Sequence, residues 1–570
     1  MEYKSETKNC QNCKQEFVIE SEDFNFYEKI KVPAPTWCPE CRLVRRLIWR
    51  NERNFYKREC NFCKKNIISA ISRDCKSPVY CHDCWWGDGW DATVYGKDYD
   101  FSKPFFQQYK ELIETVPIIN LWGFNNIQTD YSNHSAYSKN VYLSVAVRSE
   151  NVFYSQIMER SKDCVDCYWT TDSELCYQNL NTAKCYKSSY LVNCRECSDS
   201  NFLFDCVNCT DCFMCSNLRY KSFCIRNKQY EREEYLKELE KYEINSHKSQ
   251  KLFKEEFDEL YKKSIHKFAN ILKCTNVTGD NMSNSKNAHL CFNGEGEDIK
   301  YCWRATEGAK TSYDICGCLK NELIYEASIV GDNSYQTKFY IQSKNNRNSN
   351  LLYVCPDSSY LFGCVGMKSK KYCILNKQYQ KEEYEELIPK ILKQMEDIPY
   401  VDINGRIYKY GEFFPPELSP FFYNETVAQE YFPLTKEEAI LQGYKWNDRK
   451  ERNYKIDIKN ENIPDNIENI NDDILGKVIE CEHKGACNEQ CTEAFKIIPD
   501  ELKFYQRMNL PIPHLCPNCR HYQRTQKRNP LKLWYRKCMK EGCENTFETT
   551  YAPERPEKVY CERCYQQEVY

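Results

Sequence analysis

The sequence has few of the features that mark enzymes and membrane proteins. It contains no apolar run near the ~20 residues that a membrane-spanning helix needs, and its first residues form no apolar signal-peptide core. Only eight histidines are present, and no His-x-His, H-E-x-x-H, G-x-S-x-G, Walker loop or strand-linked G-x-G-x-x-G occurs. These absences exclude a helical membrane protein and weigh against an enzyme without excluding one. We therefore expect a cytoplasmic protein.

Cysteine is the residue that the sequence has in excess. In a reducing compartment, 37 cysteines indicate metal ligands, buried small apolar side chains or redox groups before disulfides, and an odd count also disfavours complete pairing. The formal net charge is only −3, so a nucleic-acid surface would need local clusters of basic residues. A chain of 570 residues divides into roughly three to five domains.

A cysteine pattern near the N-terminus returns near the C-terminus. The two copies share three spacings, which are 25 positions (Cys13 to Cys38 and Cys491 to Cys516), 19 positions (Cys41 to Cys60 and Cys519 to Cys538) and 18 positions (Cys63 to Cys81 and Cys543 to Cys561). Such agreement indicates an internal duplication.

The repeated pattern predicts two zinc ribbons at each end of the chain. Thiolates in C-x2-C pairs lie on tight turns, and two such pairs complete a closed tetrahedral Zn²⁺ site. The alternative, redox C-x-x-C pairs, needs a thioredoxin-like pattern that is not visible here. In the C-terminal copy two of the pairs have the wider spacings C-x3-C and C-x4-C. Cys75 and Cys481 are left outside the four predicted ligand sets, which are Cys10, Cys13, Cys38 and Cys41; Cys60, Cys63, Cys81 and Cys84; Cys487, Cys491, Cys516 and Cys519; and Cys538, Cys543, Cys561 and Cys564.

Further residues around the N-terminal cysteines resemble two groups of zinc-ribbon proteins. The pattern Cys10, Cys13, Phe17, Phe26-Tyr27, Pro35 and Cys38 to Arg42 is similar to that of small bacterial zinc-ribbon domains. Trp85-Trp86 and the segment from Tyr95 to Phe106 resemble longer zinc-ribbon proteins, a family without an assigned activity. The resemblance implies zinc and a bacterial origin, and it implies no catalytic residues.

The middle of the chain has a different pattern of polar and apolar residues. From about Asn126 to Cys224, short alternating segments separated by polar breaks predict strands. Cysteines recur at 21 positions, as in Cys164, Cys185 and Cys206, and a repeat of that size predicts the coil of a β-solenoid with an inward cysteine ladder. The same pattern of short alternating segments returns from Asn287 to Cys373.

The two middle regions are also copies of each other. The segment from Lys221 to Tyr235 matches that from Lys370 to Tyr384, 149 positions later, and each copy then enters a charged helical segment. The predicted fold is multi-domain and β-rich, with paired zinc ribbons at both termini flanking two duplicated β-solenoid-like regions with helical arms. Its expected parts are ribbons (1–90), a linker with a short helix (91–125), a solenoid (126–227), a helical arm (228–275), a second solenoid (276–375), a second arm (376–396), a Pro/aromatic-rich segment (397–448), a linker (449–478) and the second ribbons (479–570).

Four cysteines in the first solenoid allow a second interpretation. Cys206, Cys209, Cys212 and Cys215 approach the C-x2-C-x2-C run that holds an Fe-S cluster. Cys206 and Cys215 also belong to the 21-residue ladders, and Ser216 stands where such runs usually have Pro. We therefore favour buried packing cysteines over an Fe-S cluster or an extra zinc.

Basic residues between the ribbon cysteines suggest a partner. Between Arg42 and Lys65 there are nine Lys or Arg against two acids, and between Arg520 and Lys540 there are eight and no acids. Arginine interleaved with aromatics can neutralise phosphates and stack on unpaired bases; alternatively, these segments are solvated helices that join two ribbons. The candidate nucleic-acid contacts are Arg42, Arg45, Arg46, Arg50, Arg53, Arg520, Arg524, Arg528 and Arg536.

Three functions follow from these features. The first is a non-enzymatic adaptor that binds nucleic acid through its ribbons, RNA rather than duplex DNA because no helix-turn-helix or dimer zipper is visible. The second is a protein-interaction scaffold that uses the solenoid faces. The third is a solenoid-class enzyme acting on polysaccharide. We expect neither a membrane partner nor a small-molecule substrate.

Overall fold

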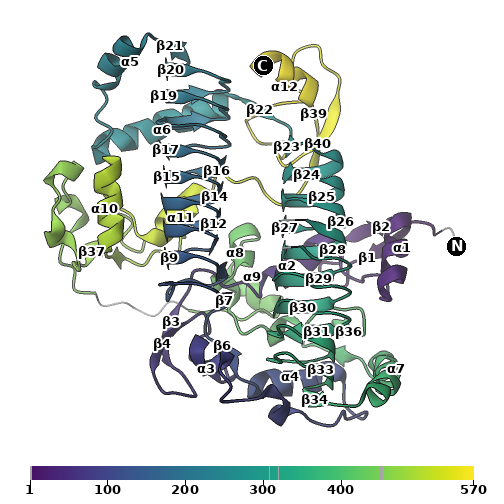
Figure 1. Cartoon of the computed structure of the whole chain (residues 1–570). Coiled ribbons are helices and arrows are strands. Elements are labelled where there is room, and N and C mark those ends of the chain that lie inside the picture. Colours follow the sequence, from purple (N-terminus) through teal and green to yellow (C-terminus); the bar gives the residue numbers. More distant parts are fainter. Residues whose placement is uncertain (1–2, 307, 319, 449–453) are drawn as a thin grey trace.

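The computed structural model describes residues 3–306, 308–318, 320–448 and 454–570. Two β-solenoids stand side by side and run in opposite directions (Figure 1). The first climbs from β7 (Gly123–Phe124) to β21 (Lys228–Gln229), and the second descends from β23 (Ile271–Leu272) to β34 (Lys377–Gln378). The predicted β-rich fold with two solenoid-like regions is confirmed.

Each solenoid is built from parallel strands that pair one coil apart. The first contains β8 (Ser135–Ala136), β9 (Lys139–Tyr142), β10 (Ala146–Val147), β11 (Glu150–Phe153), β12 (Gln156–Glu159), β13 (Lys162–Val165), β14 (Tyr168–Thr171), β15 (Glu174–Tyr177), β16 (Leu180–Ala183), β17 (Tyr186–Ser189), β18 (Asn201–Phe204), β19 (Thr210–Ser216) and β20 (Ser222–Ile225). The second contains β24 (Thr275–Ser283), β25 (Lys286–Gly294), β26 (Gly296–Lys300), β27 (Trp303–Ala305), β28 (Ala309–Cys318), β29 (Tyr325–Val330), β30 (Lys338–Ser343), β31 (Asn350–Tyr353), β32 (Ser359–Phe362) and β33 (Lys371–Ile374).

The coil of the first solenoid is 12 residues long, which corrects the predicted 21. Lys162 pairs with Glu174, and Cys164 pairs with Cys176. From Asn151 to Tyr220 every third residue has a positive φ, and four such triplets close one coil. One residue of each triplet faces inward, so small inward side chains recur at multiples of three. The 21-residue interval is one such multiple and is not the coil.

The left-handed positions explain the abundance of Asn and Asp in this region. Asp163, Asp166 and Asp172 all have a positive φ, and short Asn and Asp side chains tolerate that conformation best after Gly. The Asn140 amide also donates to Asn151 (2.9 Å), and Asn151 donates to Asp163 (2.7 Å). The period of the chain is therefore three, not the two that alternation suggested.

The four candidate Fe-S cysteines belong to this inward pattern. Cys206, Cys209, Cys212 and Cys215 are buried, and each thiol donates to the carbonyl two residues earlier at 3.2–3.4 Å. Burial raises the pKa of the Cys215 thiol to about 12. Among the described residues these four sulfurs do not gather into one ligand set. Their burial and their hydrogen bonds to backbone carbonyls fit the packing role that the sequence favours.

Helices and short hairpins surround the solenoids. The hairpins are β1 (Glu6–Asn9) with β2 (Glu16–Ile19), β3 (Tyr56–Glu59) with β4 (Asn66–Ser69), β35 (Tyr400–Val401) with β36 (Ile407–Tyr408), β37 (Ile479–Glu480) with β38 (Ala494–Phe495), and β39 (Trp534–Lys537) with β40 (Thr546–Thr549). Two parallel pairs join other parts, β5 (Val79–Tyr80) with β6 (Ile118–Ile119) and β22 (Ile265–Lys267) with β41 (Lys558–Tyr560). The helices are α1 (Ser21–Ile30), α2 (Pro39–Leu47), α3 (His82–Trp86), α4 (Phe105–Thr115), α5 (Arg232–Leu239), α6 (His247–Lys263), α7 (Lys381–Asp397), α8 (Val427–Tyr431), α9 (Lys436–Leu441), α10 (Pro499–Met508), α11 (Pro517–Thr525) and α12 (Glu562–Val569).

The helical arms and the predicted linker both pack against the rest of the chain. The long arm helix α6 buries Phe253 and Phe257 against Phe202 of the first solenoid. The predicted linker includes residues 449–453, which lie outside the described residues. Beyond them, three short 3-10 turns bury a row of isoleucines, so this part is packed and not a free connector; the row is Ile463, Ile467, Ile470 and Ile474.

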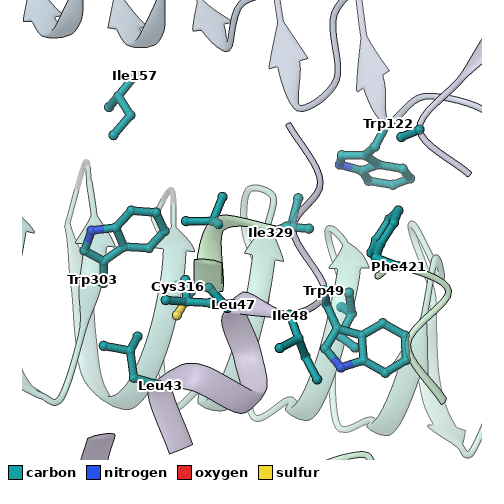
Figure 2. Packing of buried hydrophobic residues seen from close by; sticks show 14 of the residues in the cluster. Leu43, Leu47, Ile48, Trp49, Trp122, Ile157, Trp303, Cys316, Ile329 and Phe421 are labelled. Atoms are coloured by element: carbon teal, nitrogen blue, oxygen red, sulfur yellow. The ribbon is translucent and has the colours of Figure 1, made fainter. Parts of the chain in front are cut away.

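One ribbon helix lies in the core where the solenoids meet. Leu43 and Leu47 of α2 lie over the strands of the second solenoid, beside Trp303 (Figure 2). Ile157 approaches the same core from the first solenoid. Because one helix contributes to a core shared by both solenoids, the ribbon is part of the central packing and not a separate end module.

Candidate metal centres

Four groups of four cysteines bring their sulfur atoms together. In each group all the sulfur atoms lie within 4.8 Å of one another. Tetrahedral coordination with metal–sulfur bonds of about 2.3 Å requires sulfur separations of about 3.8 Å. The sulfur atoms are 3.7 Å apart in Cys13–Cys38 and 3.8 Å apart in Cys63–Cys81. The groups are Cys10, Cys13, Cys38 and Cys41; Cys60, Cys63, Cys81 and Cys84; Cys481, Cys491, Cys516 and Cys519; and Cys538, Cys543, Cys561 and Cys564.

All four groups are built in the same way. The third cysteine stands at the N-cap of a helix, where it leads α2, α3, α11 or α12. Its backbone N–H donates to the sulfur of the first cysteine at 3.2–3.3 Å. A helix N-terminus and a donated N–H both favour the thiolate that a metal binds. The first cysteines defined by this bond are Cys10, Cys60, Cys481 and Cys538.

The third group differs from the predicted ligand set. Cys481 occupies the first position, and the Cys516 N–H donates to its sulfur at 3.2 Å. Cys487, which the sequence pattern placed there, lies beside the group, with its sulfur 3.7 Å from that of Cys519. The C-x2-C rule failed because nine residues separate Cys481 from Cys491. The shared 25-residue spacing from Cys491 to Cys516 aligned the second cysteine correctly but carried no information about the first.

Backbone amides bias two of these cysteines toward the thiolate form, Cys60 at the first position of its group and Cys561 at the third position of its group. Burial raises the pKa of Cys60, but the N–H groups of Cys81 and Cys63 outweigh it and lower the value to about 7. Burial also raises the pKa of Cys561, but hydrogen bonds from the Cys564 N–H and from the side chains of Asn545, Cys564 and Cys538 together lower it to about 7. Both thiols are therefore prepared to lose their protons to a metal ion near neutral pH.

The arginines that follow the first ribbon's fourth cysteine point into the protein. Arg42, one residue after Cys41, places Nε 3.0 Å from Asp314. Arg46, one helical turn later, places Nη1 2.9 Å from the other oxygen of Asp314. Arg45 bonds Glu326 and reaches Glu412 at 2.7 Å. All three side chains are at most 1% exposed, so their charge is neutralised inside the molecule.

The second ribbon repeats this arrangement on the other solenoid. Arg520 and Arg524 follow Cys519 at the same intervals, and their atoms lie 3.2 Å and 3.3 Å from the two oxygens of Asp166. Arg520 also lies 3.3 Å from Glu501 of α10. The N-terminal ribbon thus docks on the second solenoid, and the C-terminal ribbon docks on the first.

These contacts place most of the predicted nucleic-acid residues inside the protein. Besides the arginines above, Arg50 pairs with Glu52, Arg528 bonds the Tyr168 hydroxyl, and both are almost fully buried. Arg53 and Arg536 are half-buried and donate to Asn518 (2.8 Å) and to the Ala552 carbonyl (3.2 Å). Sequence composition cannot distinguish an arginine that meets phosphate from one that meets a buried carboxylate far away in the chain.

Comparisons with known proteins add little to this geometry. No family model matches the chain, and no curated protein matches it. Among solved structures, a putative acetyltransferase from Desulfovibrio desulfuricans G20 is similar at 10% identity over 48% of this chain and 86% of that chain, with a TM-score of 0.10. That likeness carries no argument. Across the described residues, no helix combines the length and apolar character needed to cross a membrane.

Proposed function

We propose that the chain is a zinc-dependent, non-enzymatic scaffold for a protein partner. In this proposal Zn²⁺ occupies the four cysteine groups. All-sulfur donor sets with the observed separations suit tetrahedral Zn²⁺. The described cysteines are all free thiols, which supports a reducing compartment such as the cytoplasm. The resemblance to bacterial zinc-ribbon proteins stays part of the proposal.

The observation that carries the proposal is the docking of both ribbon helices onto buried aspartates. Each zinc would fix the first turn of α2 or α11, and the arginines one and five residues after the fourth cysteine then reach Asp314 or Asp166. Buried ion pairs are strongly destabilising when one partner is removed, by about 3–5 kcal/mol. Zinc would therefore act by holding these charges together, and its role would be structural.

The same observation favours protein over nucleic acid as the partner. The arginines that would neutralise phosphates already meet Asp314, Glu326 and Asp166. Parts of each solenoid remain exposed, for example at Tyr186 and Tyr335, and repeat proteins use such surfaces to bind other proteins. Exposed aromatics on the first solenoid, among them Tyr137 and Tyr186, suit such a contact.

A pull-down with nuclease-treated lysate tests the proposal. We expect specific proteins to stay bound to the zinc-loaded chain after nuclease treatment and to be lost after removal of zinc. Binding of RNA or DNA to the pure protein should be weak and should not change with Arg45→Lys, because Arg45 is buried. Tight nucleic-acid binding that falls steeply with salt, together with no retained protein, would overturn the proposal.

A further inference from the structure

A second set of metal-binding side chains lies beside the third cysteine group. Ligand atoms of His483, Cys487, Glu489 and Cys519 all lie within 4.8 Å of one another. Cys519 belongs to both sets, and its sulfur is 3.7 Å from that of Cys487. We propose that His483, Cys487 and Glu489 bind a second metal ion, of the zinc class, with Cys519 as a thiolate bridge to the ion of the third group. This goes beyond the proposed scaffold function.

The pairing of His483 with Glu489 is the first argument. Nδ1 of His483 lies 3.2 Å from Oε2 of Glu489. Both atoms are shielded from solvent, and neither makes a hydrogen bond within the described structure. An imidazole nitrogen and a carboxylate oxygen that face each other without a hydrogen bond are costly to bury. A cation that accepts a lone pair from each would satisfy both.

The donor chemistry is the second argument. Zn²⁺ binds imidazole nitrogen, thiolate sulfur and carboxylate oxygen, and sites that mix these donors are common for this ion. A thiolate sulfur has lone pairs for two ions, so Cys519 can serve both. The outer imidazole nitrogen of His483 lies 3.4 Å from the amide nitrogen of Gln523 on α11, which places a polar neighbour where metal-bound histidines usually have one.

The loop that carries these ligands is the third argument. His483, Cys487 and Glu489 all lie within the nine residues between Cys481 and Cys491. The corresponding turn of the N-terminal ribbon, from Cys10 to Cys13, has only two residues. Lys484 and Gly485 adopt a positive φ, and the loop brings the sulfur of Cys487 to 3.7 Å from that of Cys519. Because the two ribbons are otherwise built alike, the extra loop is the feature that would add an ion.

Access distinguishes this site from the third cysteine group beside it. The side chains of His483 and Glu489 are 25% and 16% exposed, and both line a cavity of about 680 Å³ between the first solenoid, α6 and the C-terminal ribbon. Lys254 extends from α6 into the same cavity. In contrast, Cys481, Cys516 and Cys519 are fully buried. The second ion would therefore exchange with solvent more readily than its neighbour.

Metal counting on the full purified chain tests the inference. We expect five zinc ions per chain, one of which is released rapidly to a chromogenic chelator while four are retained. His483→Ala, Cys487→Ser and Glu489→Gln should each reduce the count to four and remove the rapid phase, with an unchanged circular dichroism spectrum. Glu482→Gln, at the neighbouring position that pairs with Lys251, is the matched control and should keep five.

Two results would overturn the inference. One is four zinc ions in the wild type with no rapid phase. The other is a count that stays at five in all three loop variants. A fall to three in Cys487→Ser from a wild-type count of four would instead assign Cys487 to the third cysteine group. None of these results touches the scaffold proposal, which needs only the four groups and is tested by the pull-down.

Discussion

Asp166 and Asp314 stand at equivalent points of contact in the two solenoids. Each is fully buried, each adopts a positive φ, and each receives two arginines from a ribbon helix of the opposite end of the chain. The internal duplication is therefore preserved as a pair of interfaces. The ends of the chain cross, because each ribbon docks on the solenoid that is more distant from it in sequence.

Replacement of either aspartate should destabilise the protein strongly. Asp166→Asn and Asp314→Asn leave two buried guanidinium groups without their carboxylate, which costs about 3–5 kcal/mol. The unfolding midpoint in urea should fall accordingly. Asp172→Asn is the matched control, since Asp172 pairs with Arg160 at the surface, where a lost pair costs about 0–1 kcal/mol. Equal effects of the buried and exposed replacements would contradict the interface.

Cys481 should matter for the C-terminal ribbon more than Cys487 does. Cys481→Ser removes the first ligand of the third group and should unfold that ribbon, because zinc binding supplies much of the folding free energy of such small units. Cys487→Ser should leave the ribbon folded. Limited proteolysis of residues 479–525 distinguishes the two. Protection in Cys481→Ser and cleavage in Cys487→Ser would restore the assignment based on sequence alone.

The inward cysteines of the first solenoid should tolerate small residues and reject large ones. Cys206→Ala and Cys209→Ala should not change the iron or zinc content, because both side chains are buried in the solenoid core and their thiols donate to backbone carbonyls. Cys212→Leu forces extra atoms into a narrow, filled core and should cost about 1–3 kcal/mol. Elemental analysis and thermal unfolding measure the two effects. Iron that disappears with Cys206→Ala would reinstate the cluster.

Acid should destabilise the protein through buried neutral histidines. Burial lowers the pKa of His134 and of His266 to about 4 from an unfolded value of 6.5. Since the folded pKa is depressed, this stability is complete above about pH 6.5 and is lost as the pH falls toward 4. His266 alone should account for about 3 kcal/mol over that window. His266→Gln should flatten the decline in unfolding free energy between pH 6.5 and 4, and an unchanged slope would contradict it.

Much of this architecture could be predicted because it depends on the spacing of residues within short segments of the sequence. Cysteine spacing located three of the four metal centres. The coil length was missed because cysteines at multiples of three also recur at 21. The repeated Asp and Asn at three-residue spacing, such as Asp163 and Asp166, were the available signal.

The carboxylates that pair with the buried arginines could not be predicted from residue spacing within the ribbons. Arg42 meets Asp314 across 272 positions, and Arg520 meets Asp166 across more than 350. No pattern within either ribbon encodes such a partner, so a run of basic residues suggested phosphate instead. Likewise, Cys481 was identifiable only from the bond that its sulfur accepts from Cys516. Long-range contacts therefore determine where these arginines lie and which cysteine completes one ligand set.

Hydrogen exchange after removal of zinc tests the central claim most directly. If zinc holds the ribbon helices on Asp166 and Asp314, chelation should expose the amides of α2 (Pro39–Leu47) and α11 (Pro517–Thr525) first. Strands of the solenoid core, such as β13 and β15, should stay protected. Unchanged protection of both helices in zinc-free protein would contradict the account, as would solenoid strands that exchange together with them.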